Sequence, residues 1–183
     1  MSTTLADHYL ANALVEFRRY KSLADRAMAQ IDDPVFFAVL DPEANSIAIL
    51  VKHMAGNMRS RWRDFLTSDG EKPDRDRDSE FIITPADTRP VLMARWEEGW
   101  QLMFQALEPL AGTDLLRTVT IRGEPHTIIA ATNRQVAHYA YHVGQIVFLA
   151  KHARSTAWQS LSIPRGQSAQ FNAAKAAKRD SST

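Results

Sequence analysis

The strongest constraint on the fold is the spacing of apolar residues in four long segments of the chain. In each segment they recur at intervals of three and four residues, which places them on one face of an α-helix. The segments run from Leu5 to about Ile31, from Asn45-Ser46 to about Thr67, from Asp87 to about Leu110, and from Thr127 to about Arg154. Because each helix must bury its apolar face, the pattern predicts an all-α fold, a four-helix bundle.

The residues that flank these segments favour helix ends. Asp32-Asp33-Pro34 ends the first helix, because proline disfavours the helical conformation in the residue before it. Ser46 and Thr127 are good N-caps for the second and fourth helices. Asp87 is the expected cap of the third helix, with Pro90 in its first turn, where the missing N–H is harmless.

The segments between and after the helices have their own patterns. Residues 69–83 are charged and lack a helical period, which predicts a long crossover after the second helix. Val119 and Ile121 alternate with polar residues and predict one short strand or extended arm before the fourth helix. Residues 158–172 lack a helical period but keep large apolar side chains, so we expect them to lie over the bundle. The single domain is predicted to span residues 1–172, followed by a basic, disordered tail at 173–183.

Composition excludes several classes of function. The chain has no cysteine, which excludes disulfides, thiolate metal ligands and a nucleophilic cysteine. Lys+Arg number 22 and Asp+Glu 21, so no overall charge directs the protein to nucleic acid or to a membrane. The first ten residues do not resemble a signal peptide, and apolar runs such as 47–51 fall far short of the ~20 residues of a membrane span. We therefore expect a soluble cytoplasmic protein.

Three histidines are candidate metal ligands. His138 and His142 are four residues apart on the fourth predicted helix, which places their imidazoles on one face, about 5–6 Å apart at Cβ. His53 lies at the edge of the apolar face of the second helix and is the natural third ligand. Imidazole binds zinc, nickel, iron and copper. Spacing alone leaves a metal site and a set of hydrogen-bonded core histidines equally open.

Longer motifs carry a resemblance to a known group of proteins. The chain has one histidine on the second helix and HxxxH followed by Gly-Gln-Ile on the fourth. The informative segments are Lys-His-Met-Ala-Gly-Asn-Met-Arg-Ser-Arg-Trp at 52–62, Asp-Gly-Glu-Lys at 69–72, His-Tyr-Ala-Tyr-His-Val-Gly-Gln-Ile at 138–146 and Ser-Ile-Pro-Arg-Gly-Gln at 162–167. Together they resemble an uncharacterised, domain-of-unknown-function branch of the DinB/YfiT-like superfamily of metal-binding four-helix bundles. The resemblance covers nearly the whole chain.

The resemblance implies a site and a chemistry that the spacing does not show. It implies that His53, His138 and His142 bind a divalent ion, most often nickel or zinc, with iron and manganese as alternatives. It also implies a homodimer. Characterised relatives use low-molecular-weight thiols such as bacillithiol, mycothiol or glutathione in S-transfer or isomerisation, although no thiol-binding signature maps onto this chain residue by residue.

Residues near the histidines have two interpretations each. Asn57 and Gln145 lie about one turn after His53 and His142, where they could orient water or a substrate; they are equally well explained as buried amides that satisfy the backbone. Arg61, like Arg59, could pair with a substrate carboxylate, although such arginines more often pair with nearby acids.

The resulting hypothesis is a metal-dependent, S-transferase-like or hydrolase-like enzyme that acts on small electrophiles. In it, a small-molecule thiol bound at the metal attacks the electrophile, and the catalytic residues are not assigned. The alternative is a non-catalytic metal-binding or stress-response protein.

Overall fold

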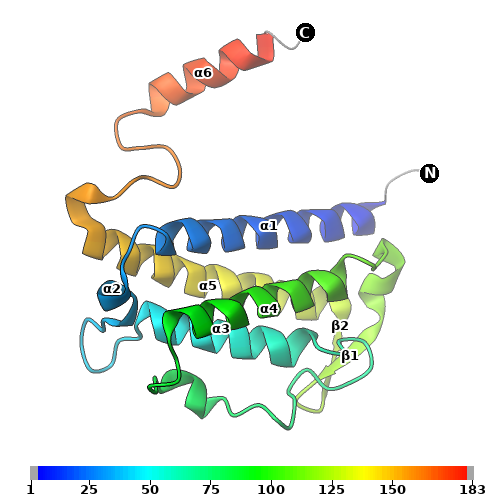
Figure 1. Ribbon diagram of the computed structural model, residues 1–183. Coiled ribbons are helices and arrows are strands. Elements are labelled where there is room, and N and C mark those ends of the chain that lie inside the picture. Colours follow the sequence, from blue (N-terminus) through cyan, green and yellow to red (C-terminus); the bar gives the residue numbers. More distant parts are fainter. Residues whose placement is uncertain (1–3, 181–183) are drawn as a thin grey trace.

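The computed structural model describes residues 4–180, and these residues are mostly helical (Figure 1). The elements, in chain order, are α1 (Leu5–Met28), α2 (Asp33–Phe37), α3 (Ile47–Trp62), the 3₁₀ helix η1 (Asp78–Phe81), α4 (Arg89–Leu107), the 3₁₀ helix η2 (Gly112–Leu116), β1 (Thr118–Ile121), β2 (Glu124–Thr127), α5 (Ile128–Arg154), the 3₁₀ helix η3 (Ser155–Ala157) and α6 (Ser168–Asp180). The prediction of a mainly helical fold is confirmed.

Side-chain caps explain where the long helices begin. The Ser46 hydroxyl accepts a hydrogen bond from the Ile49 N–H at 3.1 Å, and the Thr127 hydroxyl accepts one from the Ala130 N–H at 3.3 Å. Both predicted caps are therefore confirmed. Thr88, rather than Asp87, precedes α4. The predicted Asp87 cap is wrong because its carboxylate is bound instead by neighbouring side chains, including that of Lys52 at 2.8 Å.

Three helices end earlier than their apolar patterns predict. α1 ends at Met28 instead of Ile31, and α4 ends at Leu107 instead of Leu110. α3 ends at Trp62 instead of Thr67, because Arg63 is extended and Asp64 has a φ of 51°. Phe65 remains buried at 5% exposure, so the apolar spacing continues past the helix end. A buried side chain just after the end of a helix therefore produces the same apolar spacing in the sequence as one more turn of helix.

The connections contain elements that the pattern missed. Residues 33–37 form α2, whose N-cap is Asp32. The long crossover contains η1. The predicted single strand is one arm of an antiparallel hairpin, in which Thr118 pairs with Thr127 and Ile121 with Glu124. Arg122 and Gly123 at its turn have φ values of 56° and 76°, which a tight two-residue hairpin turn requires.

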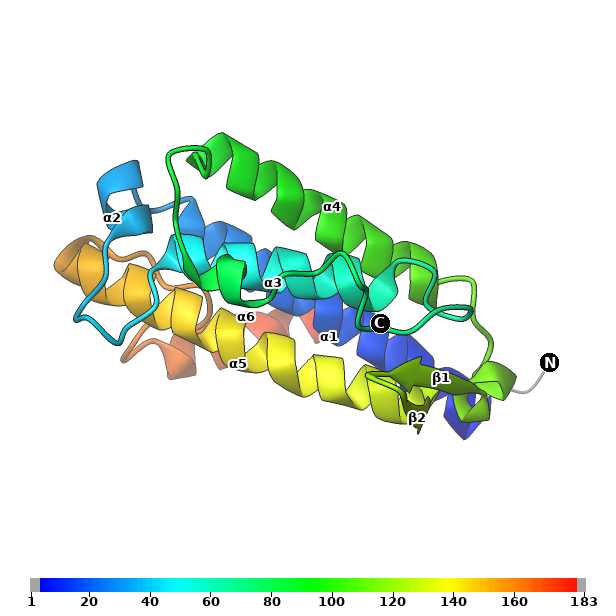
Figure 2. The same ribbon diagram turned by 90° about the horizontal axis from the view of Figure 1, so that it is seen from below.

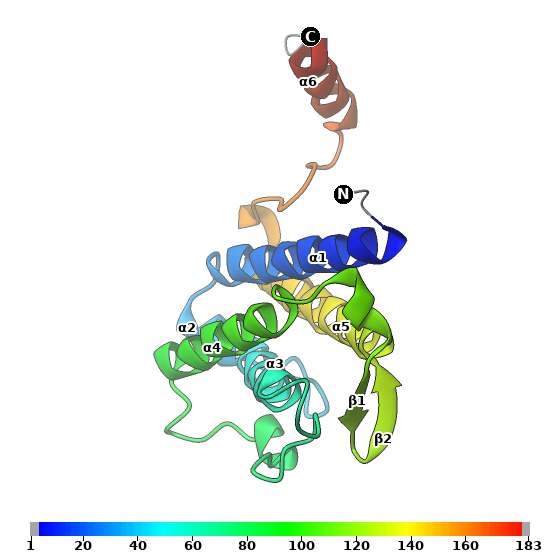
Figure 3. The same ribbon diagram turned by 90° about the vertical axis from the view of Figure 1, so that its right-hand side faces the viewer.

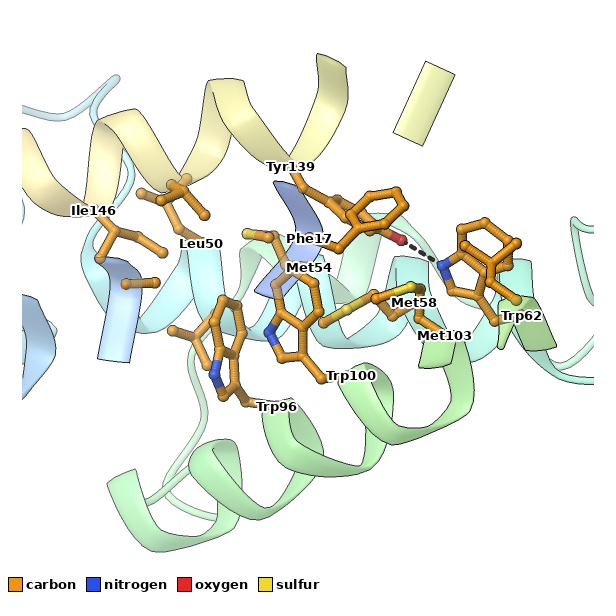
Figure 4. Packing of buried hydrophobic residues seen from close by; sticks show 14 of the residues in the cluster. Phe17, Leu50, Met54, Met58, Trp62, Trp96, Trp100, Met103, Tyr139 and Ile146 are labelled. Atoms are coloured by element: carbon orange, nitrogen blue, oxygen red, sulfur yellow. Dashed lines mark hydrogen bonds between the residues drawn. The ribbon is translucent and has the colours of Figure 1, made fainter. Parts of the chain in front are cut away.

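The long helices α1, α3, α4 and α5 pack around one apolar core (Figure 2). Close-packed aromatic and methionine side chains fill the part of the core shown in Figure 4, where the Trp62 indole donates a hydrogen bond to the Tyr139 hydroxyl at 2.9 Å. The Tyr139 hydroxyl in turn donates to the Asn57 side-chain oxygen at 3.2 Å. Gly99 allows α4 to approach α3 closely, because a Cβ there would lie 3.0 Å from Met58. This packing holds α3 and α5, which carry the candidate ligands, in a fixed relation.

The C-terminal segment differs from its predicted course. Trp158 and Leu161 pack against the core as expected, but Ile163 and Phe171 are 38% and 41% exposed. Residues 168–180, where no helical period was expected, form α6, which projects away from the other helices (Figure 1 and Figure 3). Residues 1–3 of the predicted domain and 181–183 of the predicted tail lie outside the described residues.

Helices suited to spanning a membrane are absent from the part of the chain that the structure describes. None of its helices combines the length and the apolar character that crossing a bilayer requires.

Candidate metal centre

The structure brings the three predicted histidines together, although 85 residues separate His53 on α3 from His138 on α5. The Nε2 atom of His138 lies 3.3 Å from that of His53 and 3.0 Å from that of His142. Two imidazole nitrogens that each lie ~2.0–2.1 Å from one ion are about 3.3 Å apart in a tetrahedral shell and about 2.9 Å apart at a right angle. These two spacings therefore fit a shared cation, and all three ligand nitrogens lie within 4.8 Å of one another.

Hydrogen bonds on the far side of two rings determine which nitrogens face the centre. Nδ1 of His53 donates to the Glu80 carboxylate at 2.8 Å, and Nδ1 of His142 donates to the Gln145 side-chain oxygen at 2.8 Å. Each neutral ring then carries its proton on Nδ1, which leaves an Nε2 lone pair directed at His138. A single N–H on His138 can satisfy only one of these lone pairs well, whereas a cation accepts all of them. The donor set therefore suits a metal ion.

Glu80 belongs to the candidate site, although nothing in the sequence indicated it. It comes from η1, is 5% exposed, and accepts hydrogen bonds from Arg75 at 2.8 and 2.9 Å in addition to the one from His53. Burial raises the pKa of the Glu80 carboxyl, but the bonds from His53 and Arg75 outweigh burial and hold the pKa below its usual value. Glu80 is therefore an ionised group that orients a ligand ring, as is common around metal-binding histidines.

A glycine makes room for this carboxylate. A Cβ at position 56 would lie 2.7 Å from the Glu80 side-chain carboxyl carbon. Gly56 thus permits close approach between α3 and the crossover. The only signal in the sequence was a glycine in the middle of a helix and an acid in a charged loop, and nothing there pairs one with the other.

Burial favours the neutral form of His138 and His142, which is the form that binds metal. Burial lowers the pKa of His138 to about 3, and the neighbouring His142 and His53 act in the same direction. Burial also lowers the pKa of His142, and the hydrogen bond to Gln145 offsets part of that effect. Because protons compete with metal ions for imidazole nitrogens, a low pKa favours ion binding at neutral pH.

Gln145, Asn57 and Arg61 lie near the histidines in different roles, whereas Arg59 does not line their cleft. Gln145 contacts a ligand ring directly, as described above. Asn57 accepts the hydrogen bond from Tyr139 and also lines the cleft above the histidines. Arg61 is 3% exposed, and its ion pair with Glu71 is long, at 3.8 Å. Arg59 is exposed and lies 3.6 Å from Asp74.

The three histidines open onto a cleft of about 530 Å³. Its lining residues are His53, Asn57, Arg61, Arg75, Arg77, Phe81, Arg122, Arg134, Gln135, His138, Tyr141 and His142. His8, His126 and His152 are outside this set. If the three histidines held an ion, its open side would leave room for an external molecule beside it.

Fold and site together define a mainly helical protein with a three-histidine cluster suited to a metal ion. A model of the family described as "Protein of unknown function (DUF1572)" matches residues 4–167, so the chain belongs to this family. The match includes all three histidines and stops one residue before α6. A comparison with curated proteins gave no significant match.

Proposed function

We propose that His53, His138 and His142 hold a divalent metal ion, and that the protein uses a low-molecular-weight thiol to modify small electrophiles in an S-transferase-like reaction. The observation that carries the proposal is the convergence of three imidazoles on an open cleft, with His53 oriented from behind by Glu80 and His142 by Gln145. Nickel and zinc suit an all-imidazole set best, with iron and manganese as alternatives.

Two properties of the chain support a thiol as the partner of the ion. A bound divalent ion lowers the pKa of a thiol and so supplies a thiolate nucleophile at neutral pH. The chain contains no cysteine, so the sulfur must come from outside. The ligand set contains three neutral rings and no carboxylate, which leaves the charge of the ion uncompensated and favours an anionic ligand such as a thiolate.

We also infer that α1, α3, α4 and α5 form a DinB/YfiT-like four-helix bundle, and that two copies pair as a homodimer. The order of the histidines along the packed helices supports the first inference. For the second, Tyr141 and Phe148 on α5 are 64% and 63% exposed, which provides apolar surface for a second copy. Sedimentation equilibrium at micromolar concentration tests the dimer, and a monomer mass would refute it.

The metal is tested on protein purified without a histidine tag. Elemental analysis is expected to find one nickel or zinc ion per chain. His142→Ala is expected to lose the ion, whereas His152→Ala, on the same helix but outside the cluster, is expected to keep it. Full metal content in the His142 variant would refute the site.

The thiol is tested by calorimetric titration of the metal-loaded protein with bacillithiol, mycothiol and glutathione. Binding of one of them, lost in His142→Ala, is the expected result, and binding of none would refute the thiol.

The thermal stability of His142→Ala distinguishes an enzyme from the alternative, a non-catalytic metal-binding protein. A structural ion in a non-catalytic protein is coupled to folding, so its loss would lower stability sharply. A catalytic ion can be lost while the fold persists.

A further inference from the structure

The cleft above the histidines has an excess of positive charge. Within the described residues, every charged side chain that lines it, apart from the histidines, is an arginine: Arg61, Arg75, Arg77, Arg122 and Arg134. The carboxylates within ion-pair distance of these arginines are Glu71, Glu80 and Asp78, and none of the three lines the cleft. A divalent ion on the histidines would add to the excess.

One carboxylate, that of Glu71, is the ion-pair partner of three of these guanidinium groups. Glu71 lies 3.2 Å from Arg75, 3.2 Å from Arg122 and 3.8 Å from Arg61. The last distance is too long for a hydrogen bond. Within residues 4–180, Nε and Nη1 of the buried Arg61 have no hydrogen-bond partner. These two atoms are solvent-inaccessible, and Nη1 lies beside Gly70. A buried guanidinium with little pairing costs free energy, and an anion in the cleft that Arg61 lines would offset that cost through its charge.

Arg134 also lines the cleft, and its position relates it to the metal centre. It precedes His138 by four residues on α5, as His138 precedes His142, so the three side chains follow one face of the helix. Arg134 is exposed and forms no hydrogen bond or ion pair with any residue that the structure describes. A guanidinium one helical turn from a ligand histidine, with its donors free, is placed to hold one end of a molecule whose other end reaches the ion.

We propose that this cleft binds a small organic anion, with a carboxylate or phosphate group held by Arg61 and Arg134 and the remainder lying over the histidines. Guanidinium groups bind both kinds of oxyanion through paired N–H donors. The volume of about 530 Å³ suits a small metabolite, and Phe81 and Tyr141 supply apolar lining. The inference names the substrate class of the proposed metal site and rests on that function for its reacting end.

The test uses two molecules of equal length that differ in charge. Succinate and its neutral diamide are titrated into metal-loaded and metal-free protein by calorimetry, together with inorganic phosphate. Succinate is expected to bind both forms, and to bind at least about tenfold more tightly than the diamide, because each charge-assisted hydrogen bond is worth about tenfold or more. Binding to the metal-free form isolates the contribution of the arginines. Phosphate binding with the same dependence on arginine would extend the class to phosphate esters.

Variants assign the binding to particular residues. Arg134→Gln and Arg61→Gln are each expected to weaken succinate binding about tenfold. Arg154→Gln is the matched control, because Arg154 lies on the same helix but ~30 Å away, and it is expected to bind like the wild type. Because Arg61 is buried, circular dichroism must show that its variant is folded; the exposed Arg134 keeps the test decisive if it is not.

Equal binding of succinate and its diamide, or wild-type affinity in Arg134→Gln, would overturn the proposal. Failure here is distinguishable from failure of the proposed function. Protein that holds metal and a thiol but discriminates no anion refutes the anion site alone. Protein that binds succinate through Arg134 but takes up no metal or thiol refutes the proposed function and leaves the anion site standing.

Discussion

Replacing Glu80 with Gln tests whether the carboxylate behind His53 tunes the metal centre. The change keeps the shape of the side chain and an oxygen that can accept the proton of His53 Nδ1, now 2.8 Å away, but removes the negative charge. It also removes one carboxylate from Arg75, which retains Glu71 at 3.2 Å. Two effects follow, one on metal affinity and one on stability.

The magnitude of each effect follows from these contacts. Mutation of the group behind a metal-binding histidine typically weakens metal affinity about 10- to 100-fold, or roughly 1.4–2.7 kcal/mol, and here the change removes the carboxylate charge while keeping an acceptor oxygen. The buried Arg75 loses charge-assisted hydrogen bonds, which lowers the free energy of unfolding of the metal-free protein by about 1–3 kcal/mol. Metal affinity is measured by competition with a chromophoric chelator, at a temperature where circular dichroism shows the variant to be folded.

Glu71→Gln is the matched control for this variant. It also removes a carboxylate bound to Arg75, at 3.2 Å, but Glu71 accepts no hydrogen bond from the three histidines in the described part of the chain. We expect its metal affinity to stay within about twofold to threefold of the wild type. An equal loss of affinity in both variants would show that only the general charge near the site matters, and would refute the positioning role of Glu80.

Three further predictions follow from the same contacts. Gly56→Ala is expected to push Glu80 away from His53 and weaken metal binding about tenfold by the same chelator assay, whereas Gly144→Ala, which meets nothing within 4 Å, leaves it unchanged. Tyr139→Phe leaves a buried indole N–H without its acceptor and is expected to lower the free energy of unfolding in urea by about 1–3 kcal/mol; an unchanged midpoint would contradict this. Burial holds the pKa of His138 in the folded protein at about 3, below its ordinary value of 6.5, so the unfolded chain binds more protons between these values. The metal-free protein is therefore expected to lose stability as pH falls below about 6.5, and a flat thermal-denaturation profile between pH 7 and 4 would rule this out.

The parts of the structure that depend on neighbouring residues could be read from the amino-acid sequence. Apolar spacing located the four long helices, and Ser46 and Thr127 located two of their starts, because helix periodicity and capping act within a few residues. The same locality placed His138 and His142 on one helix face. It did not locate the end of α3 at Trp62, because the buried Phe65 continues the apolar spacing through a turn.

The surroundings of the histidines depend on contacts between distant segments, which no local pattern specifies. Glu80 reaches His53 because the crossover folds back along α3 and Gly56 admits its side chain, and both facts belong to tertiary packing. The same is true of the cleft, whose arginines come from the crossover, the hairpin and two helices. The sequence alone thus determined the four long helices and the pairing of His138 with His142 on one helix face, because a helix orders residues close along the chain, and it named His53 as the third candidate ligand. Only the tertiary structure decided which groups orient those ligands and what charge faces them, because packing, not sequence distance, brings those groups together.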